Sequence, residues 1–188
     1  MPVTELKLDR MALDDVGVNS RRLAEAIHKQ LGEVSSAVPV YEIANALDIH
    51  EIREERLDGF EAALLTTPER GYGSILVNLR SNRQRRRFSV GHELYHFLND
   101  FHTPTTEQGF RCSGSDMTAA NLEDPDRHLK QEAEANAFSI ELLTPRNWMK
   151  PYLRRAPNLN EVLSLATDFD ISREAAARRY AHSDDCGR

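Results

Sequence analysis

Apolar positions in the first part of the chain recur at helical spacing. In residues 20–31 they return every three or four positions, Ser20 can cap the start, and Gly32 can end the helix. A second short helix is expected over residues 40–47, directly after Pro39, because proline is favoured at helix starts. The pattern therefore predicts two short helices near the N-terminus.

The hydrophobic period shortens in the middle of the chain. Residues 50–56, 60–66 and 73–79 read as short strands, separated by an Asp-Gly pair and by a PERGYG turn. The last of the three is the clearest, because it holds an unbroken apolar run. Three strands in succession predict a small, mainly antiparallel sheet.

Two longer helices follow the sheet, with a loop between them. Ser81 can cap a helix over residues 82–99, and another helix is expected over residues 128–143. The intervening residues 101–127 are rich in Pro, Gly, Ser, Thr and Asp, and a loop of this length is usually functional or mobile. The remainder, to about His182, reads as three short helices, so the chain belongs to the α+β class.

Composition is that of a globular protein of one domain. The chain has 188 residues, of which 40% are hydrophobic, enough to form a buried core. No apolar run is long enough to span a membrane, and the N-terminal segment lacks the basic start and apolar stretch of a signal peptide. Cys112 and Cys186 are the only cysteines, so we expect free thiols. These features predict a cytoplasmic protein.

Net charge argues against a general nucleic-acid binder. The sequence has 24 basic and 30 acidic side chains, which gives a formal charge of −6. One basic cluster stands out, formed by Arg80, Arg83, Arg85, Arg86 and Arg87. It reads first as a solvated helix face and otherwise as a surface for an acidic partner.

An H-E-x-x-H motif lies within the helix expected over residues 82–99. His92 and His96 are four residues apart, so they project from one face of the helix and can bind one metal ion together. Glu93 follows the first histidine and can reach a water on the metal, whose pKa zinc lowers toward about 7. Glu93 can then take a proton as this water attacks a carbonyl, and pass it to the leaving amine. A surface helix that carries these residues by chance is the alternative, but apolar residues surround the motif.

A catalytic zinc needs a third protein ligand and an open fourth position. Glu132 and Glu134 both lie on the helix expected over residues 128–143. Glu132 shares a helix face with apolar and small residues, whereas Glu134 shares a face with charged residues that looks solvated. We therefore expect Glu132 to be the third ligand. Asn136, one turn further on, can support the ligands by hydrogen bonding.

These residues resemble the ImmA/IrrE family of metallopeptidases. GHELYHFL is followed by QEAEANAFSIELLTP, which is similar to the family pattern E-x-E-A-N-x-F-A-x-x-L-L-x-P. The matching positions are Glu132, Glu134, Ala135, Asn136, Phe138, Leu142, Leu143 and Pro145. Ser139 stands where the family commonly has alanine. The resemblance covers about residues 20–155.

The resemblance implies a zincin-like fold, in which a small sheet lies beside the H-E-x-x-H helix and the glutamate helix packs behind it. It implies a metalloendopeptidase domain over 1–155 that binds one Zn²⁺ per chain. Residues 156–188 would form a helical appendage on the same domain, with a disordered tail. The implied substrate is an intracellular protein, commonly a transcriptional repressor of the helix-turn-helix type, cut in a stress or mobile-element response. Substrate would bind as an extended strand, and strand 73–79 could offer its edge.

Two other functions remain open. Segment 161–181 imitates a helix-turn-helix with Arg173, Arg178 and Arg179 on its second helix, which would suit a DNA-binding regulator. A catalytically silent metal-binding partner protein is the other alternative. Glu93 argues against it, because a purely structural metal site has no use for this residue.

Several residues near the expected site have no assigned role. An oxyanion stabiliser is expected beside the metal, and Tyr72, Tyr95, His102 and His128 are all conceivable. Cys112 reads as an ordinary free thiol, although a cysteine close to zinc could also be a ligand or be sensitive to oxidation.

Overall fold

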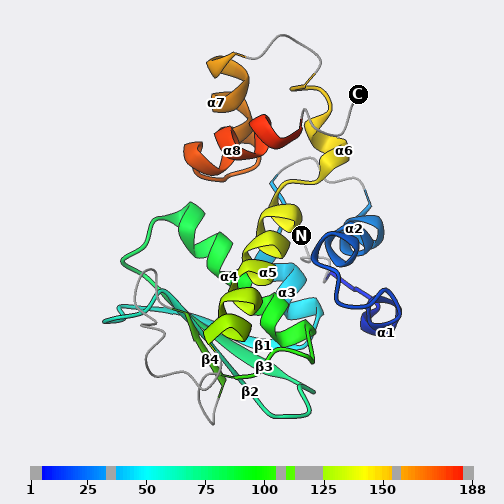
Figure 1. Cartoon of the computed structure of the whole chain (residues 1–188), viewed down its shortest axis with the longest axis vertical. Coiled ribbons are helices and arrows are strands. Elements are labelled where there is room, and N and C mark those ends of the chain that lie inside the picture. The colour runs from blue at the N-terminus through cyan, green and yellow to red at the C-terminus, as the bar shows by residue number, and fades with distance from the viewer. Residues whose placement is uncertain (1–5, 33–36, 105–108, 113–124, 154–157, 184–188) are drawn as a thin grey trace, which may run out of the picture.

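The computed structural model of the chain describes residues 6–32, 37–104, 109–112, 125–153 and 158–183. Their helices and strands follow one another as α1 (Arg10–Asp14), α2 (Ser20–Leu31), α3 (Val40–Ala46), β1 (Ile49–Glu55), β2 (Ala62–Thr66), β3 (Gly73–Asn78), α4 (Arg83–Leu98), β4 (Gly109–Cys112), α5 (Pro125–Leu143), α6 (Arg146–Met149), α7 (Leu159–Asp168) and α8 (Arg173–Ser183). Figure 1 shows the sheet at one end of the molecule, α4 and α5 in the middle, and α7 and α8 at the other end. This arrangement confirms the predicted α+β class.

Four strands form one mixed sheet in the order β1-β3-β2-β4. The two pairings made by β2 are antiparallel, as expected, but β1 and β3 run parallel. Because β3 is paired on both sides, residues 73–79 cannot offer a free edge to substrate, and that expectation was wrong. Among the described strands, β1 and β4 form the edges.

The segment read as loop, residues 101–127, contains more regular structure than its composition predicts. β4 lies within it, and α5 begins at Pro125, three residues before the expected start. β4 spans only four residues and is defined by its backbone pairing with β2, so no alternation of apolar residues marks it. The described part of the chain does not include residues 105–108 and 113–124 or the side chain of Cys112. The roles considered for Cys112 therefore stay open.

Asparagines cap the two helices for which serine caps were predicted. Asn19 precedes α2 and Asn82 precedes α4, and each side chain accepts a hydrogen bond from a backbone N–H of the first turn. Ser20 lies inside α2, where its Oγ donates to the backbone carbonyl of Glu134 in α5, 3.0 Å away. The Ser81 side chain instead contacts a carboxylate of the segment before β2. The helices were correctly placed, and only the capping residue was wrong by one position.

Helix α4 forms the centre of the core. It contacts β2, β3, α3 and α5, and its side chains are buried continuously from residue 89 to residue 98. Gly91 lets α5 approach closely, because an added Cβ would lie 2.7 Å from Ser139 Oγ. Ser139 in turn donates a hydrogen bond to the carbonyl of Phe88, at 2.7 Å. The serine that replaces the family's alanine therefore ties α5 to α4.

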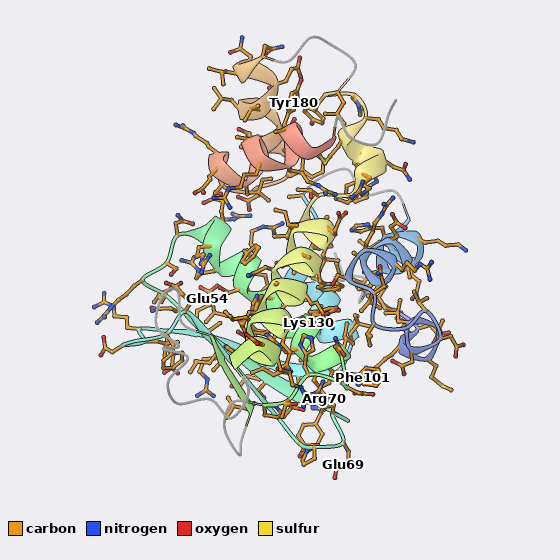
Figure 2. All side chains as sticks on the ribbon, viewed as in Figure 1. Glu54, Glu69, Arg70, Phe101, Lys130 and Tyr180 are labelled. Atoms are coloured by element: carbon orange, nitrogen blue, oxygen red, sulfur yellow. The ribbon has the colours of Figure 1, made fainter. Side chains whose placement is uncertain are left out.

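Arg70 holds the C-terminal end of α4 from the turn before β3. Its buried guanidinium donates to the backbone carbonyls of His96, Asn99 and His102, and Figure 2 shows it at the sheet end of the helix. Carbonyls at and just beyond the C-terminal end of a helix carry partial negative charge, so a cation there is favourable. Burial lowers the pKa of Arg70. The segment that carries His102 is thereby fixed relative to His96.

The arginine cluster at the start of α4 is paired within the chain. Its five members contact carboxylates as Arg80–Asp58, Arg83–Asp170, Arg85–Glu61, Arg86–Glu54 and Arg87–Asp170. Asp170 belongs to the turn between α7 and α8 and has a positive φ of 51°. The side chains of Arg80, Arg83 and Arg85 are exposed, as on a solvated face, whereas Arg86 and Arg87 are more buried. The ion pairs of the four arginines that belong to α4 link this helix to its neighbours.

The C-terminal helices pack against the end of α5. Arg179 of α8 donates to both carboxylate oxygens of Glu141, at 2.8 and 2.5 Å. The proposed division at residues 155 and 156 stays a prediction, and the tail 184–188 lies outside the described residues. In the described ranges no helix is both long and apolar enough to cross a membrane.

Candidate metal centre

Helices α4 and α5 bring three potential ligand residues together. His92 Nε2 and His96 Nε2 lie 3.1 Å apart. Glu132 presents Oε2 at 3.2 Å from His92 Nε2 and Oε1 at 3.3 Å from His96 Nε2. No other cluster of His, Cys, Asp or Glu with this spacing occurs among the residues the structure describes. The histidine pair and the glutamate predicted from helix periodicity therefore meet at one point.

The spacing of these atoms fits a bound transition metal. Zinc binds nitrogen and oxygen ligands at about 2.0–2.1 Å, so neighbouring ligands of a tetrahedral site are about 3.3 Å apart. The observed separations of 3.1 to 3.3 Å match that value. Two imidazoles and a carboxylate also form a common ligand set of catalytic zinc, which keeps one coordination position open.

Burial and charge shift the pKa of each of the three groups. Burial lowers the pKa of His96 to about 3, so its ring is neutral at pH 7 and has a lone pair to donate. Burial also lowers the pKa of His92, but the hydrogen bond to Glu132 and the charge of Glu93 outweigh this and raise it overall. Burial raises the pKa of Glu132, yet its hydrogen bonds to both histidines leave it well below the ordinary value. Glu132 is therefore ionised and attracts a cation, and His92 Nε2 must carry no proton when it binds a metal.

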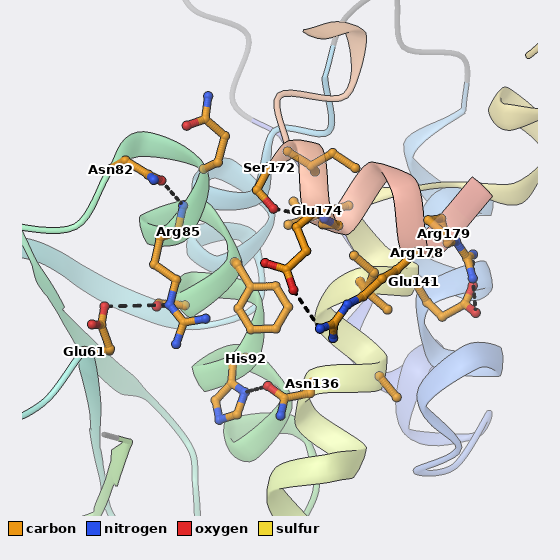
Figure 3. A pocket seen from close by; sticks show the side chains of 18 of the residues that line it. Glu61, Asn82, Arg85, His92, Asn136, Glu141, Ser172, Glu174, Arg178 and Arg179 are labelled. Carbon is orange, nitrogen blue, oxygen red and sulfur yellow. Dashed lines mark hydrogen bonds and ion pairs between the residues drawn. The ribbon is translucent and has the colours of Figure 1, made fainter. Parts of the chain in front are cut away.

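A cleft of about 1070 Å³ opens beside this cluster. His92, Glu93, Glu132 and Asn136 line one end, and residues of α8 line the other. Figure 3 shows His92 hydrogen bonded to Asn136 beneath this cleft. Glu93 is buried with no exposed surface, directly beside the ligand histidine. The open side of the centre thus faces a space that can admit substrate.

Each histidine of the cluster has a different outer partner. His92 Nδ1 lies 3.0 Å from Asn136 Oδ1, as expected for a supporting residue. His96 Nδ1 lies 2.8 Å from His102 Nδ1, and His102 Nε2 lies 3.1 Å from Glu134 Oε2. The sequence treated Glu134 as solvated, and it is indeed 37% exposed and 4.0 Å from Lys130. Its contact with His102 was missed, because periodicity along one helix does not show what a distant segment contributes.

The candidates for an oxyanion stabiliser separate by position. Tyr72 is 54% exposed, and the Tyr95 hydroxyl donates to a backbone carbonyl ahead of α2. His102 lies behind His96 rather than in the cleft. His128 Nε2 lies 4.0 Å from Glu132 Oε1. The geometry assigns the oxyanion role to none of them.

The helix-turn-helix-like segment 161–181 is engaged in packing. Arg179 has only 10% of its side chain exposed and is bound to Glu141, while Arg178 pairs with Glu174 on its own helix at 2.6 Å. The turn between the helices is fixed to α4 through Asp170 and Arg83. Arg179 is therefore not available for contacts with DNA phosphates.

Comparison with known families agrees with this geometry. The family model Peptidase_M78, described as IrrE N-terminal-like domain, matches residues 45–180. The match covers most of the chain, including both ligand helices and the C-terminal pair, and the chain belongs to this family. No curated protein matches the sequence. The resemblance seen in the H-E-x-x-H and E-x-E-A-N segments is confirmed, and a metallopeptidase is supported.

Proposed function

We propose that this Peptidase_M78 protein is a zinc-dependent endopeptidase. His92, His96 and Glu132 would hold one Zn²⁺, and Glu93 would be the general base. The observation that carries the proposal is the cluster of His92, His96 and Glu132, whose nearest ligand atoms are 3.1 to 3.3 Å apart, beside a cleft that Glu93 also lines. A silent metal-binding protein would have no need for a buried carboxylate at that place.

The bound zinc would supply a Lewis acid that lowers the pKa of water to about 7 and polarises the scissile carbonyl. Glu93 takes a proton from the attacking water as the new C–O bond forms. The same carboxyl then gives its proton to the leaving nitrogen as the C–N bond breaks. The products are one carboxylate and one amine. Asn136 orients His92 through Nδ1, which keeps Nε2 directed toward the ligand position.

The cleft between α4, α5 and α8 supports a polypeptide substrate. Its volume of about 1070 Å³ exceeds the size of most small-molecule sites. Apolar side chains such as Phe88 and Ile140 lie on its wall, and Arg85 and Arg178 contribute charge. Strand addition of the substrate would have to use β1 or β4, since β3 is paired on both sides.

The substrate we propose is a cytoplasmic transcriptional repressor of the helix-turn-helix type, cleaved in a stress or mobile-element response. This step rests on the ImmA/IrrE resemblance, in which many members are encoded beside the repressor that they cut. A helix-turn-helix repressor encoded next to the gene of this protein would therefore be the first substrate to examine.

The test is cleavage of that repressor by the purified, zinc-loaded protein, followed by mass spectrometry of the fragments. We expect one specific cut, lost after chelation, restored by added Zn²⁺, and reduced about 100- to 10,000-fold in Glu93→Gln. Glu93→Gln should retain its metal, which separates loss of the base from loss of the site. Equal cleavage by wild type and Glu93→Gln would contradict the proposal.

A further inference from the structure

A chain of three groups extends outward from His96, away from the cleft. His96 Nδ1 and His102 Nδ1 lie 2.8 Å apart, and His102 Nε2 lies 3.1 Å from Glu134 Oε2. An ionised carboxylate can only accept a hydrogen bond, so the proton of a neutral His102 must be on Nε2. His102 Nδ1 then has a lone pair and must accept from His96 Nδ1–H. His96 Nε2 consequently keeps its lone pair for a metal.

We propose that His102 and Glu134 are positioning residues that fix the tautomer and ring orientation of His96 for metal binding. The proposal rests on the metal centre proposed above, but not on proteolysis. Glu134 sets which nitrogen of His102 carries the proton, and His102 in turn sets which nitrogen of His96 carries its proton. Asn136 serves His92 in the same sense, by accepting from its Nδ1.

The surroundings of His102 hold it in this geometry. The residue is 4% exposed, and the ring of Tyr95 packs edge-on against it with the ring centres 5.2 Å apart. Its backbone carbonyl accepts from Arg70, which also binds the carbonyl of His96. One guanidinium therefore fixes both histidine backbones, so that their rings meet without large rearrangement.

Glu134 also has a more ordinary contact, with Lys130 one turn earlier on α5. Their charged atoms are 4.0 Å apart, and the lysine side chain is 77% exposed. Exposed helix pairs of this kind contribute little to stability. Lys130→Ala is therefore a matched control, because it removes the surface ion pair and leaves the hydrogen bonds from Glu134 through His102 to His96 intact.

Zn²⁺ affinity measured by competition with a chromophoric chelator tests the proposal. Loss of an outer partner of a ligand histidine typically weakens metal binding 10- to 100-fold. We expect a loss of about that size in His102→Leu, which has no acceptor, and a smaller loss in Glu134→Ala. His102→Asn should recover most of the affinity, because its amide oxygen can stand near the position of Nδ1. Lys130→Ala should bind Zn²⁺ as the wild type does.

A second readout follows the protons directly. Nitrogen-15 NMR of the Zn²⁺-loaded wild type should show a proton on His96 Nδ1 and none on His102 Nδ1. Thermal unfolding in excess chelator checks that each variant is folded. If His102→Leu does not fold, Glu134→Ala on the partly exposed face of α5 decides the question.

Three results would overturn the inference. If both His102→Leu and Glu134→Ala bound Zn²⁺ with wild-type affinity, the hydrogen bonds from Glu134 through His102 would not support His96. Equal losses in His102→Asn and His102→Leu would assign His102 to packing alone. Absence of Zn²⁺ binding by the wild type would remove the metal centre and this proposal together, whereas failure of repressor cleavage with normal Zn²⁺ binding would affect only the proposed substrate.

Discussion

Two glutamates of α5 line opposite ends of the same cleft, and they are compensated in different ways. Glu141 accepts from two arginines, Arg146 at 2.7 Å and Arg179 at 2.5 Å. Glu132 faces the Nε2 atoms of His92 and His96. Figure 3 shows the arginine end and the histidine end of this cleft.

The difference lies in the charge of the partners. A guanidinium carries a permanent positive charge, so the Glu141 cluster is neutralised and binds the C-terminal helices to α5. An imidazole can be neutral and can donate a lone pair, so the Glu132 cluster can bind a metal cation once neither Nε2 atom carries a proton. Carboxylates on one helix thus serve structure at one end and, as we propose, chemistry at the other.

The largest expected effect comes from removing Glu132 from the end of the cleft that holds His92 and His96. Glu132→Ala removes one of three ligands, so we expect loss of bound Zn²⁺ and a fall in peptidase activity of about 1000-fold or more. Activity on the cleaved substrate and thermal unfolding with and without Zn²⁺ measure the two effects. Glu141→Ala is the matched control, and it should still be stabilised by added Zn²⁺.

Removing the charge of Glu141, which is paired with Arg146 and Arg179, should lower the stability of the fold instead. Glu141→Gln leaves two guanidinium groups without a counter-charge, and we expect a loss of about 3 kcal/mol in the free energy of unfolding. Chemical denaturation of the metal-free protein measures it. Bound Zn²⁺ per folded chain should not change, and a loss of metal would show that the two ends are not separate.

The contribution of the Glu141 carboxylate to the free energy of unfolding should depend on pH in a defined direction. Burial raises the pKa of Glu141, but its hydrogen bonds with Arg146 and Arg179 outweigh burial and hold the pKa below the ordinary 4.5. The carboxylate therefore stabilises the fold above about pH 4.5, and this stabilisation is lost as the pH falls through the folded pKa. The stability difference between wild type and Glu141→Gln should be largest near pH 7 and shrink below pH 4.5. A constant difference down to pH 3 would contradict it.

A smaller loss of stability is expected from a substitution at Gly91, where α4 and α5 touch. Gly91→Ala places a Cβ 2.7 Å from Ser139 Oγ, so α4 and α5 must shift, at a cost of about 1–3 kcal/mol. In a Ser139→Ala background the same Cβ meets only ordinary contacts, and most of the loss should disappear. A double-mutant cycle by denaturation separates this clash from helix propensity, which favours alanine.

The smallest effect is expected at the exposed pair of α8. Arg178 and Glu174 are 75% and 73% exposed, so Arg178→Ala should change the free energy of unfolding by less than about 0.5 kcal/mol. Arg179→Ala, on the same helix but bound to Glu141, should be several times more costly. Equal effects of the two substitutions would remove the distinction between surface and structural arginines.

Much of the site could be predicted from the sequence because its determinants are local. The four-residue spacing of His92 and His96 fixes their common face, and helix periodicity alone favours Glu132 over Glu134. The E-x-E-A-N segment then identifies the family.

The missed features depend on contacts between distant segments. His102 pairs with His96 through a turn of the chain after α4, and Glu141 is neutralised by Arg179 of α8, although its own helix face looks solvated. The parallel pairing of β1 and β3 likewise depends on strand order rather than on alternation. Local patterns therefore located the helices and the candidate ligands, whereas the supporting contacts required the fold.

The most direct measurement is the metal content of the purified protein, determined by elemental analysis beside Glu132→Ala and Glu141→Ala. We predict about one zinc per chain in the wild type and in Glu141→Ala, and close to none in Glu132→Ala. A wild type that binds no zinc after metal is added back, or a Glu132→Ala variant that binds as much as the wild type, would contradict the assignment of the metal centre.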